Sequence, residues 1–338
     1  MTAETSKRKI LIVGGGAVGS VYGWRLQEGG AHVAMVCRSN FKVVKETGYT
    51  ITSGKMDPVQ FIPDAVYSNG EEAVAGNNVF DYVIVCTKCL PNLYDPAEVV
   101  APYIISDKTV IVLVQNGIGI EEPVRVRFPN NPIISGIAYI DVDQTQSGII
   151  RHGGTNFIVC GFYVKEGDDL NAYNKDNAHI LEDIKNVFTA GNMGINVQDN
   201  VQEYRWSKII WNGSFNPISV VAGCKDSKEL IDFPPTRQLL LDAMAELYRV
   251  GEAVLGKKVP PVAGQDSPES VLKYTRDRDA PVYPSMMVDC INKRPMEHEV
   301  IVKNTIVAAK KCGVAVPILE TVYALLVSVE RSYCPPKN

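Results

Sequence analysis

The sequence predicts an α/β domain with a parallel sheet over residues 1–198 and an all-helical domain over residues 199–338. Three observations predict this division. In the first half, continuous apolar runs of strand length alternate with helical patterns, as in buried parallel strands joined by helices. A glycine-rich turn separates the first apolar run from the first helical pattern. Beyond about residue 200, strand signals nearly vanish and helical patterns remain.

The first elements form a strand–turn–helix–strand unit. The apolar run Ile10 to Val13 meets the glycine-rich turn Gly14 to Gly19, and a helical pattern follows. A second apolar run, Val33 to Cys37, ends on Arg38. This order is that of the Rossmann dinucleotide-binding unit, so the spacing G-x-G-x-x-G stands where that motif requires it.

The three glycines of the motif each have a physical role. Gly14 permits the tight turn, Gly16 lets the backbone approach a pyrophosphate, and Gly19 lets helix and strand pack closely. The first turn of the helix then offers unpaired N–H groups to phosphate. The sequence therefore predicts a dinucleotide cofactor bound over residues 14–19.

The second strand ends on a basic group. An acidic residue at this position usually binds the ribose 2′-hydroxyl of NAD(H). Here the position holds Arg38, with Ser39 and Lys42 close behind, and a cationic pocket suits a 2′-phosphate. We therefore predict NADP(H) as the cofactor. The alternative is an ordinary strand end with solvated charges.

Composition excludes several functional classes. The net charge is −4 without a basic block, which argues against nucleic-acid binding. The longest apolar stretches are of strand length or carry charges, so we expect no membrane span. Residues 2–8 are polar and lead directly into a strand, so we expect no signal sequence. The eight cysteines lack a disulfide spacing, which favours a reducing, cytoplasmic location.

No metal site is expected. Cys86 and Cys89 have the C-x-x-C spacing, but they follow a strand and no second pair completes a zinc site. None of the four histidines is spaced with another for a metal.

The sequence patterns also predict the other strands and helices. Buried strands are expected at Phe80–Thr87 and Thr109–Val114, with a short irregular insertion over residues 50–65. Several short, antiparallel strands are expected from residue 132 to 164, and a helix over 174–190. In the second half, helices are expected at 201–223, 235–256, 266–275, 284–292, 296–312 and 317–331.

One predicted helix carries a polar stripe on an otherwise apolar surface. Lys208, Asn212 and Asn216 stand at positions i, i+4 and i+8, so they share one face of the helix. Ile209, Ile210 and neighbouring aromatic residues occupy the other faces. A buried polar stripe needs partners, and a ligand would supply them. The alternative is an amphipathic surface helix whose stripe faces water.

Two further groups of polar residues are candidates for a site. Ser285 and Asp289 stand at i and i+4, and Glu297 opens the next predicted helix, where the dipole favours a carboxylate. Ordinary helix capping would also explain them. Asn116 and Gly117 follow a predicted parallel strand, where open α/β sheets bind ligands, although Asn-Gly is also a favoured turn.

Taken in order, these segments resemble the ketopantoate reductase family. The resemblance covers essentially the whole chain and rests on segments that the sequence shares with the family: GGGAVGS, Lys88 after FDYVIVCT, VLVQNGIG, IIRHGGTNFIVCG, KIIWNGSFNP, PSMMVDCINKRPMEHEVI and AAKKCGVAVP. It implies an N-terminal Rossmann domain, a helical C-terminal domain and NADPH in the cleft between them. The implied reaction reduces the ketone of ketopantoate to pantoate, in pantothenate biosynthesis.

The resemblance also implies residue roles. Lys208 would be the catalytic lysine that protonates the developing alkoxide, and Glu297 would hold the lysine and the substrate hydroxyl. The implied substrate-binding residues are Asn116, Asn212, Asn216, Ser285 and Asp289. The implied cofactor-binding residues are Gly14, Gly16, Ala17, Val18, Gly19, Arg38, Lys88 and Asn116.

The chain departs from the family at the substrate pocket. Family members carry an asparagine three residues before the serine of the SM-x-x-D motif, where this chain has Val282. Where the family often reads E-I-D-x-I-N-G, this chain reads Glu297 to Lys303 as EHEVIVK, with Val302 at the asparagine position. Losing a polar carboxylate contact costs about 1–3 kcal/mol if nothing replaces it.

Several alternatives stay open at this point. The chain could be a paralogue that reduces another 2-oxo acid or a ketone, or a non-catalytic NADP(H)-binding sensor. A 6-phosphogluconate-type dehydrogenase shares the two-domain layout, but Lys208 stands in the K-x-x-x-N-x-x-x-N stripe of the reductases. The hydrophobic helical domain is compatible with a homodimer.

Overall fold

The described chain divides into two units. The computed structural model describes residues 7–54 and 56–334. Within these residues, unit 1 is formed by 7–88, 95–115 and 121–201. Unit 2 is formed by 89–94, 116–120 and 202–334, so two short loops from the first half of the sequence belong to it.

Unit 1 is built on one mixed sheet to which ten strands of the described chain contribute. Their order is β4-β3-β9-β8-β7-β6-β1-β2-β5, and β10 pairs with β9. Of these described pairs, β3–β4 and β8–β9 are antiparallel and the others are parallel. The strands are β1 (Lys9–Val13), β2 (His32–Val36), β3 (Tyr49–Ser53), β4 (Met56–Phe61), β5 (Ala65–Tyr67), β6 (Tyr82–Val85), β7 (Val110–Leu113), β8 (Ile133–Gln146), β9 (Ile149–Phe162) and β10 (Gly194–Val197).

The central strands are buried on both faces, as their sequence predicts. Every residue of β6 and β7 is buried, and so is β1 after its first residue. The helices of unit 1 are α1 (Ala17–Glu28), α2 (Phe41–Thr47), α3 (Gly70–Val74), α4 (Pro96–Val100), α5 (Glu122–Arg127), α6 (Leu170–Asp176) and α7 (Ala178–Ala190).

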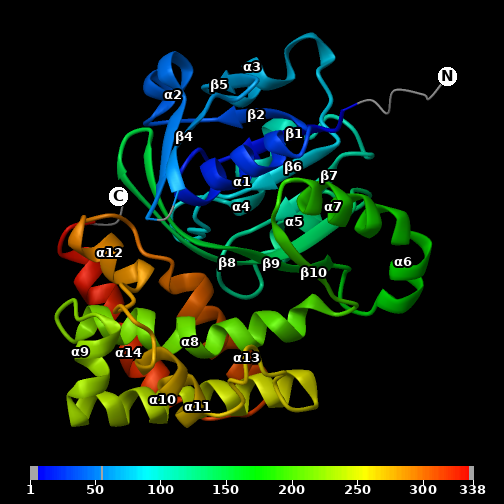
Figure 1. Ribbon diagram of the computed structural model, residues 1–338. Coiled ribbons are helices and arrows are strands. Elements are labelled where there is room, and N and C mark those ends of the chain that lie inside the picture. Colours follow the sequence, from blue (N-terminus) through cyan, green and yellow to red (C-terminus); the bar gives the residue numbers. More distant parts are fainter. Residues whose placement is uncertain (1–6, 55, 335–338) are drawn as a thin grey trace. The chain divides into compact units, whose positions relative to one another are not determined.

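The sheet curves around α1 (Figure 1). This helix contacts β1 and β2, and it also contacts β8 and β9, which stand several positions away in the strand order. Residues from these elements form the main hydrophobic core of the unit. The arrangement is a Rossmann-like half-barrel, so the predicted fold class of the N-terminal region is confirmed.

The structure corrects two expectations for unit 1. The segment 50–65 was expected to be irregular, but Tyr49–Ser53 and Met56–Phe61 pair as the antiparallel strands β3 and β4. Residues 132–164 hold two strands of 14 residues each, β8 and β9, instead of several short ones. Gly161 lies inside β9, where an added Cβ would meet Gln198 O at 2.3 Å. Close packing, and not a turn, requires this glycine.

Unit 2 is helical, which confirms the predicted class of the C-terminal region. Its elements are α8 (Val201–Val221), α9 (Ser227–Asp232), α10 (Pro234–Leu255), α11 (Pro268–Arg276), α12 (Ser285–Ile291), the π-helical turn η3 (Glu299–Lys303), α13 (Asn304–Lys311) and α14 (Pro317–Arg331). Helix α10 contacts α9, α11, α13 and α14 (Figure 1). Close approach of α8 to α10 depends on Gly213, where an added Cβ would meet Leu247 at 3.0 Å.

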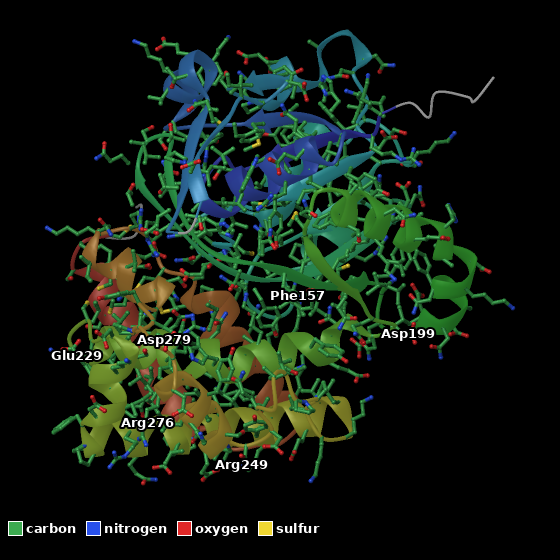
Figure 2. All side chains as sticks on the ribbon, in the orientation of Figure 1. Phe157, Asp199, Glu229, Arg249, Arg276 and Asp279 are labelled. Atoms are coloured by element: carbon green, nitrogen blue, oxygen red, sulfur yellow. The ribbon has the colours of Figure 1, made fainter. Side chains whose placement is uncertain are left out.

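The sequence patterns missed one helix of unit 2. No helix was expected over residues 224–234, but α9 lies there. It begins with a capping box: the Asp226 side chain accepts from Glu229 N, and the Glu229 side chain, labelled in Figure 2, accepts from Asp226 N. The spacing D-x-x-E was the available signal.

Within 7–54 and 56–334, no helix has the length and the apolar character that crossing a bilayer requires.

Candidate active site

The glycine-rich turn of unit 1 is fixed by hydrogen bonds to neighbouring strands. Gly14 N and Gly15 N both donate to Val36 O, at 3.2 and 3.1 Å. On the other side, Gly15 O accepts from the Tyr49 hydroxyl at 2.9 Å and from the Asn40 side chain. Sequence reasoning missed Asn40 and Tyr49, because their contacts join segments far apart in the chain.

The three motif glycines differ in what surrounds them. Gly14 has φ +107°, and an added Cβ at Gly19 would lie 2.1 Å from Gly14 O. At Gly16, the N-cap of α1, an added Cβ would meet nothing within 4 Å. Open space therefore lies beside the first turn of α1, where N–H groups and the helix dipole suit an anion. This cradle fits the pyrophosphate of a dinucleotide.

The other predicted cofactor residues lie at the same edge of the sheet. Arg38 follows β2 and is exposed, and Lys88 follows β6 and is partly buried. The chain adds β2 and β5 on one side of β1 and then β6 and β7 on the other side, so the strand order reverses beside β1. Such a switch point is where open α/β sheets bind ligands. The structure therefore brings Arg38 and Lys88 to the carboxyl edge that carries the glycine turn.

A second polar cluster lies entirely within unit 2. The Glu297 carboxylate is 8% exposed; Oε1 accepts from Cys89 N at 3.1 Å, and Oε2 accepts from Asn116 Nδ2 at 3.3 Å. Asn116 Oδ1 in turn accepts from Asn212 Nδ2 at 3.5 Å. Asn116, expected at both the cofactor and the substrate, thus lies with Glu297 and Asn212.

Lys208 belongs to this cluster electrostatically. It lies on α8, one turn before Asn212. Burial and, to a smaller extent, the Arg205 guanidinium lower the pKa of Lys208, the Glu297 carboxylate opposes them, and the net value is about 8. A lysine with this pKa can both donate and accept a proton near neutral pH.

The loop that carries Asn116 is tied to the helices of unit 2 through its backbone. Ile118 N donates to Val300 O at 3.0 Å, Arg205 Nη1 donates to Gly117 O at 3.0 Å, and Asn304 Nδ2 donates to Ile118 O at 2.8 Å. Gly117 has φ +96°, and an added Cβ would lie 2.6 Å from Val300 O. Sequence reasoning missed Arg205 and Asn304, whose partners are remote in the chain.

The remaining predicted substrate residues have structural partners. Asn216 Oδ1 accepts from Ser285 Oγ at 3.3 Å and from Met286 N at 3.1 Å, at the start of α12. Asp289 Oδ1 lies 3.2 Å from Arg294 Nε. The structure therefore brings Asn216 and Ser285 together, while Asp289 pairs with the segment that leads to Glu297.

Two family models match the chain. The model described as "Ketopantoate reductase PanE/ApbA" matches residues 10–165, and its C-terminal counterpart matches residues 200–330. The chain belongs to the ketopantoate reductase family. This confirms the resemblance on which the residue roles were predicted.

Individual relatives agree with this assignment. The chain is 27% identical over 318 residues to a 2-dehydropantoate 2-reductase from Nostoc sp., with 94% of each protein covered. The crystal structure of 2-dehydropantoate 2-reductase from Methylococcus capsulatus has 31% identity and a TM-score of 0.77, covering 96% of this chain and 97% of that one. These relatives are oxidoreductases, and the family has a dinucleotide-binding fold.

A more distant structure shares the fold. D-mandelate dehydrogenase, solved as a ternary structure with NADH and anilino(oxo)acetate, has 22% identity and a TM-score of 0.79. The matched region covers 96% of this chain and 99% of the D-mandelate dehydrogenase chain. This likeness shows that the architecture is common to the two chains.

Proposed function

We propose that this chain is an NADP(H)-dependent oxidoreductase that reduces a 2-oxo acid to a 2-hydroxy acid, with ketopantoate as first candidate and pantoate as product. Residues 1–198 bind the dinucleotide, and residues 199–338 supply the catalytic groups. The observation that carries the proposal is Lys208, with a pKa of about 8, beside the buried Glu297 and two asparagines. A positioned acid next to hydrogen-bonding amides suits carbonyl reduction.

The residue roles follow from where charge develops. A bound nicotinamide dinucleotide supplies the hydride that the carbonyl carbon accepts. Lys208 donates a hydrogen bond to the carbonyl oxygen, stabilises the negative charge that builds there, and transfers its proton. Glu297 keeps the lysine oriented, while Asn116 and Asn212 form a polar wall around the reacting groups. Asn216, Ser285 and Asp289 complete the proposed substrate side.

The proposed cofactor contacts belong to the glycine turn and its neighbours. Backbone groups of residues 14–19, Ala17 and Val18 included, receive the pyrophosphate at the start of α1. Arg38 binds the 2′-phosphate, and Lys88 contributes a second positive charge.

A paralogue with another substrate is the alternative that a specific observation favours. Val282, at the position of the family's asparagine, uses its backbone in two hydrogen bonds with Ser227, at 2.9 and 3.0 Å, and offers a carboxylate no polar side chain. Val302 is fully buried. D-mandelate dehydrogenase illustrates that the fold accommodates another oxo acid and NADH.

The substrate alternatives are separated by comparing kcat/KM over a panel of 2-oxo acids. We expect ketopantoate to exceed pyruvate, 2-oxoisovalerate and oxaloacetate by at least about tenfold, because each good polar or apolar contact contributes 1–3 kcal/mol to discrimination. A higher kcat/KM for another member of the panel would identify the chain as a paralogue.

The pKa of Lys208 predicts opposite pH profiles for the two reaction directions. Reduction needs the ammonium form, so its kcat should be flat at low pH and fall as pH rises through about 8. Oxidation needs the neutral amine, so its kcat should rise through the same pH. In Lys208→Arg the group stays charged, so the residual kcat should no longer change as pH passes through about 8. If Lys208→Arg keeps the pH dependence of the wild type, this dependence belongs to another titrating group.

Arg38 predicts the preference between the two dinucleotides. We expect Arg38→Ala to weaken NADPH binding by about 10- to 100-fold, the value of a charge-assisted hydrogen bond, and to leave NADH binding unchanged. Dissociation constants measured by titration check this. Lys175→Ala, an exposed lysine of α6, is the matched control. Equal losses of affinity for NADPH and NADH in Arg38→Ala would show that Arg38 does not bind the 2′-phosphate.

A further inference from the structure

The catalytic candidate Glu297 is flanked by two residues that share one partner. Glu330, on α14, is 7% exposed, and its Oε1 accepts from Met296 N at 2.6 Å. Its Oε2 lies 2.8 Å from Nε2 of the buried His298. One carboxylate from the last helix therefore holds the residues immediately before and after Glu297.

A second carboxylate lies within ion-pair distance of the other ring nitrogen of His298. Its Nδ1 lies 3.4 Å from Glu299 Oε1, which also accepts from the Tyr323 hydroxyl, while Lys303 Nζ donates to Glu299 Oε2 at 2.7 Å. Burial alone would lower the pKa of His298, but the contacts with Glu299 and Glu330 raise it to about 9. The imidazole is thus positively charged and fixed between two carboxylates, and its partners balance the charge.

These groups lie where this chain departs from the usual family pattern. His298, Glu299 and Lys303 replace the residues of the E-I-D-x-I-N-G segment, while Glu297 itself is retained. The Glu297 carboxylate points to a different set of partners, Cys89 N and Asn116 Nδ2. A shift of the backbone at 296–298 would therefore pull this carboxylate from both partners.

We propose that Glu330 is a positioning residue that fixes the orientation of Glu297 through Met296 and His298. It acts through these two residues, by keeping the Glu297 carboxylate on Cys89 N and Asn116. The catalytic consequence rests on the proposed function, in which Glu297 orients Lys208. The effect of Glu330 on the orientation of Glu297 does not depend on the proposed function, because this orientation is fixed by contacts within the protein.

The chain supplies a matched control, a second buried glutamate that contacts the opposite end of α14. Glu246, on α10, is 2% exposed, and its two carboxylate oxygens accept from Ile318 N at 3.1 Å and Leu319 N at 3.0 Å. It is a buried glutamate, and its two backbone donors lie in the first turn of α14, whereas Glu330 lies in the last turn. Its loss should destabilise the fold without affecting the candidate site.

The experiment compares Glu330→Ala, Glu330→Gln and Glu246→Ala in the full chain. We expect Glu330→Ala to lower kcat by about 100-fold, as a small misplacement of a catalytic group does. The Kd for NADPH should stay within about twofold, because the glycine turn and Arg38 are untouched. Glu246→Ala should lower Tm to a similar extent and leave kcat unchanged. Equal losses of kcat in Glu330→Ala and Glu246→Ala would reduce Glu330 to a structural residue.

Amide hydrogen exchange tests the positional part without any turnover. The Cys89 N–H is protected by the Glu297 carboxylate, so its exchange should be at least about tenfold faster in Glu330→Ala and unchanged in Glu246→Ala. Unchanged Cys89 exchange in Glu330→Ala would overturn the proposal. If the wild type reduces no 2-oxo acid, the proposed function fails, and the Cys89 exchange still decides the role of Glu330.

Glu330→Gln keeps the proposal testable if the alanine variant does not fold. Its amide oxygen can still accept from Met296 N, but the amide cannot hold a charged imidazole by an ion pair. We expect its kcat and its Cys89 exchange to lie between those of the wild type and of Glu330→Ala. Wild-type values for both quantities in a folded Glu330→Gln protein would contradict the proposal.

Discussion

Replacing Lys208 by alanine should lower kcat for 2-oxo-acid reduction by about 1,000-fold, the combined effect of losing a general acid and an oxyanion donor. The side chain is the cationic group beside Glu297, and its pKa of about 8 suits proton transfer. Asn116 and Asn212 stay in place, so the variant should keep its fold and its affinity for NADPH. Steady-state oxidation of NADPH, with a parallel binding titration, measures both quantities.

A nearby lysine controls for the loss of positive charge. Lys225, after the end of α8, is exposed and pairs with Glu229 at 2.8 Å. Lys225→Ala should leave kcat unchanged, since exposed ion pairs contribute little to stability. Unchanged turnover in Lys208→Ala would exclude this residue as the proton donor and would leave the function of the stripe on α8 open.

Substitutions at Gly16 and Gly19 should affect different properties: NADPH affinity at Gly16 and stability at Gly19. In Gly16→Val the new side chain meets nothing in the protein, so Tm should stay unchanged. NADPH affinity should fall by about 10- to 100-fold, because the side chain occupies the space beside the α1 amides and removes a charge-assisted hydrogen bond. Gly19→Ala should instead destabilise unit 1 by about 3 kcal/mol, because its Cβ would lie 2.1 Å from Gly14 O.

Thermal unfolding and dinucleotide titration on the same samples separate these two effects. Gly54→Val serves as the control, because an added Cβ at Gly54 also meets nothing within 4 Å and the residue lies outside the glycine turn. If Gly16→Val binds NADPH as tightly as Gly54→Val does, the space beside α1 is not the pyrophosphate site.

The local patterns of the sequence were sufficient for the fold class. The buried runs at β1, β6 and β7 and the helical periodicity after residue 200 depend on neighbours in the chain, so they are readable without coordinates. The length of β8 and β9 was not readable in this way. Gly161 in β9 is required by packing against the remote Gln198, whereas in the sequence alone a glycine resembles a turn.

The candidate site shows the same limit. Periodicity placed Lys208, Asn212 and Asn216 on one face of α8, and the family resemblance added Glu297. The hydrogen bond that joins Asn116 to Glu297, across 181 positions of the chain, depends on the tertiary fold. The same holds for Glu330, which lies 34 positions after its partner Met296 and carries no motif of its own.

The most direct test of the proposed function is the oxidation of NADPH by the wild-type protein with ketopantoate. We expect a kcat/KM of about 10⁴ M⁻¹s⁻¹ or more, within the ordinary range of enzymes acting on their own substrate. If another 2-oxo acid is reduced while ketopantoate is inert, the proposed reaction is supported and the proposed substrate is wrong. Binding of NADPH without turnover of any carbonyl compound would contradict the proposal and would identify a non-catalytic dinucleotide-binding protein.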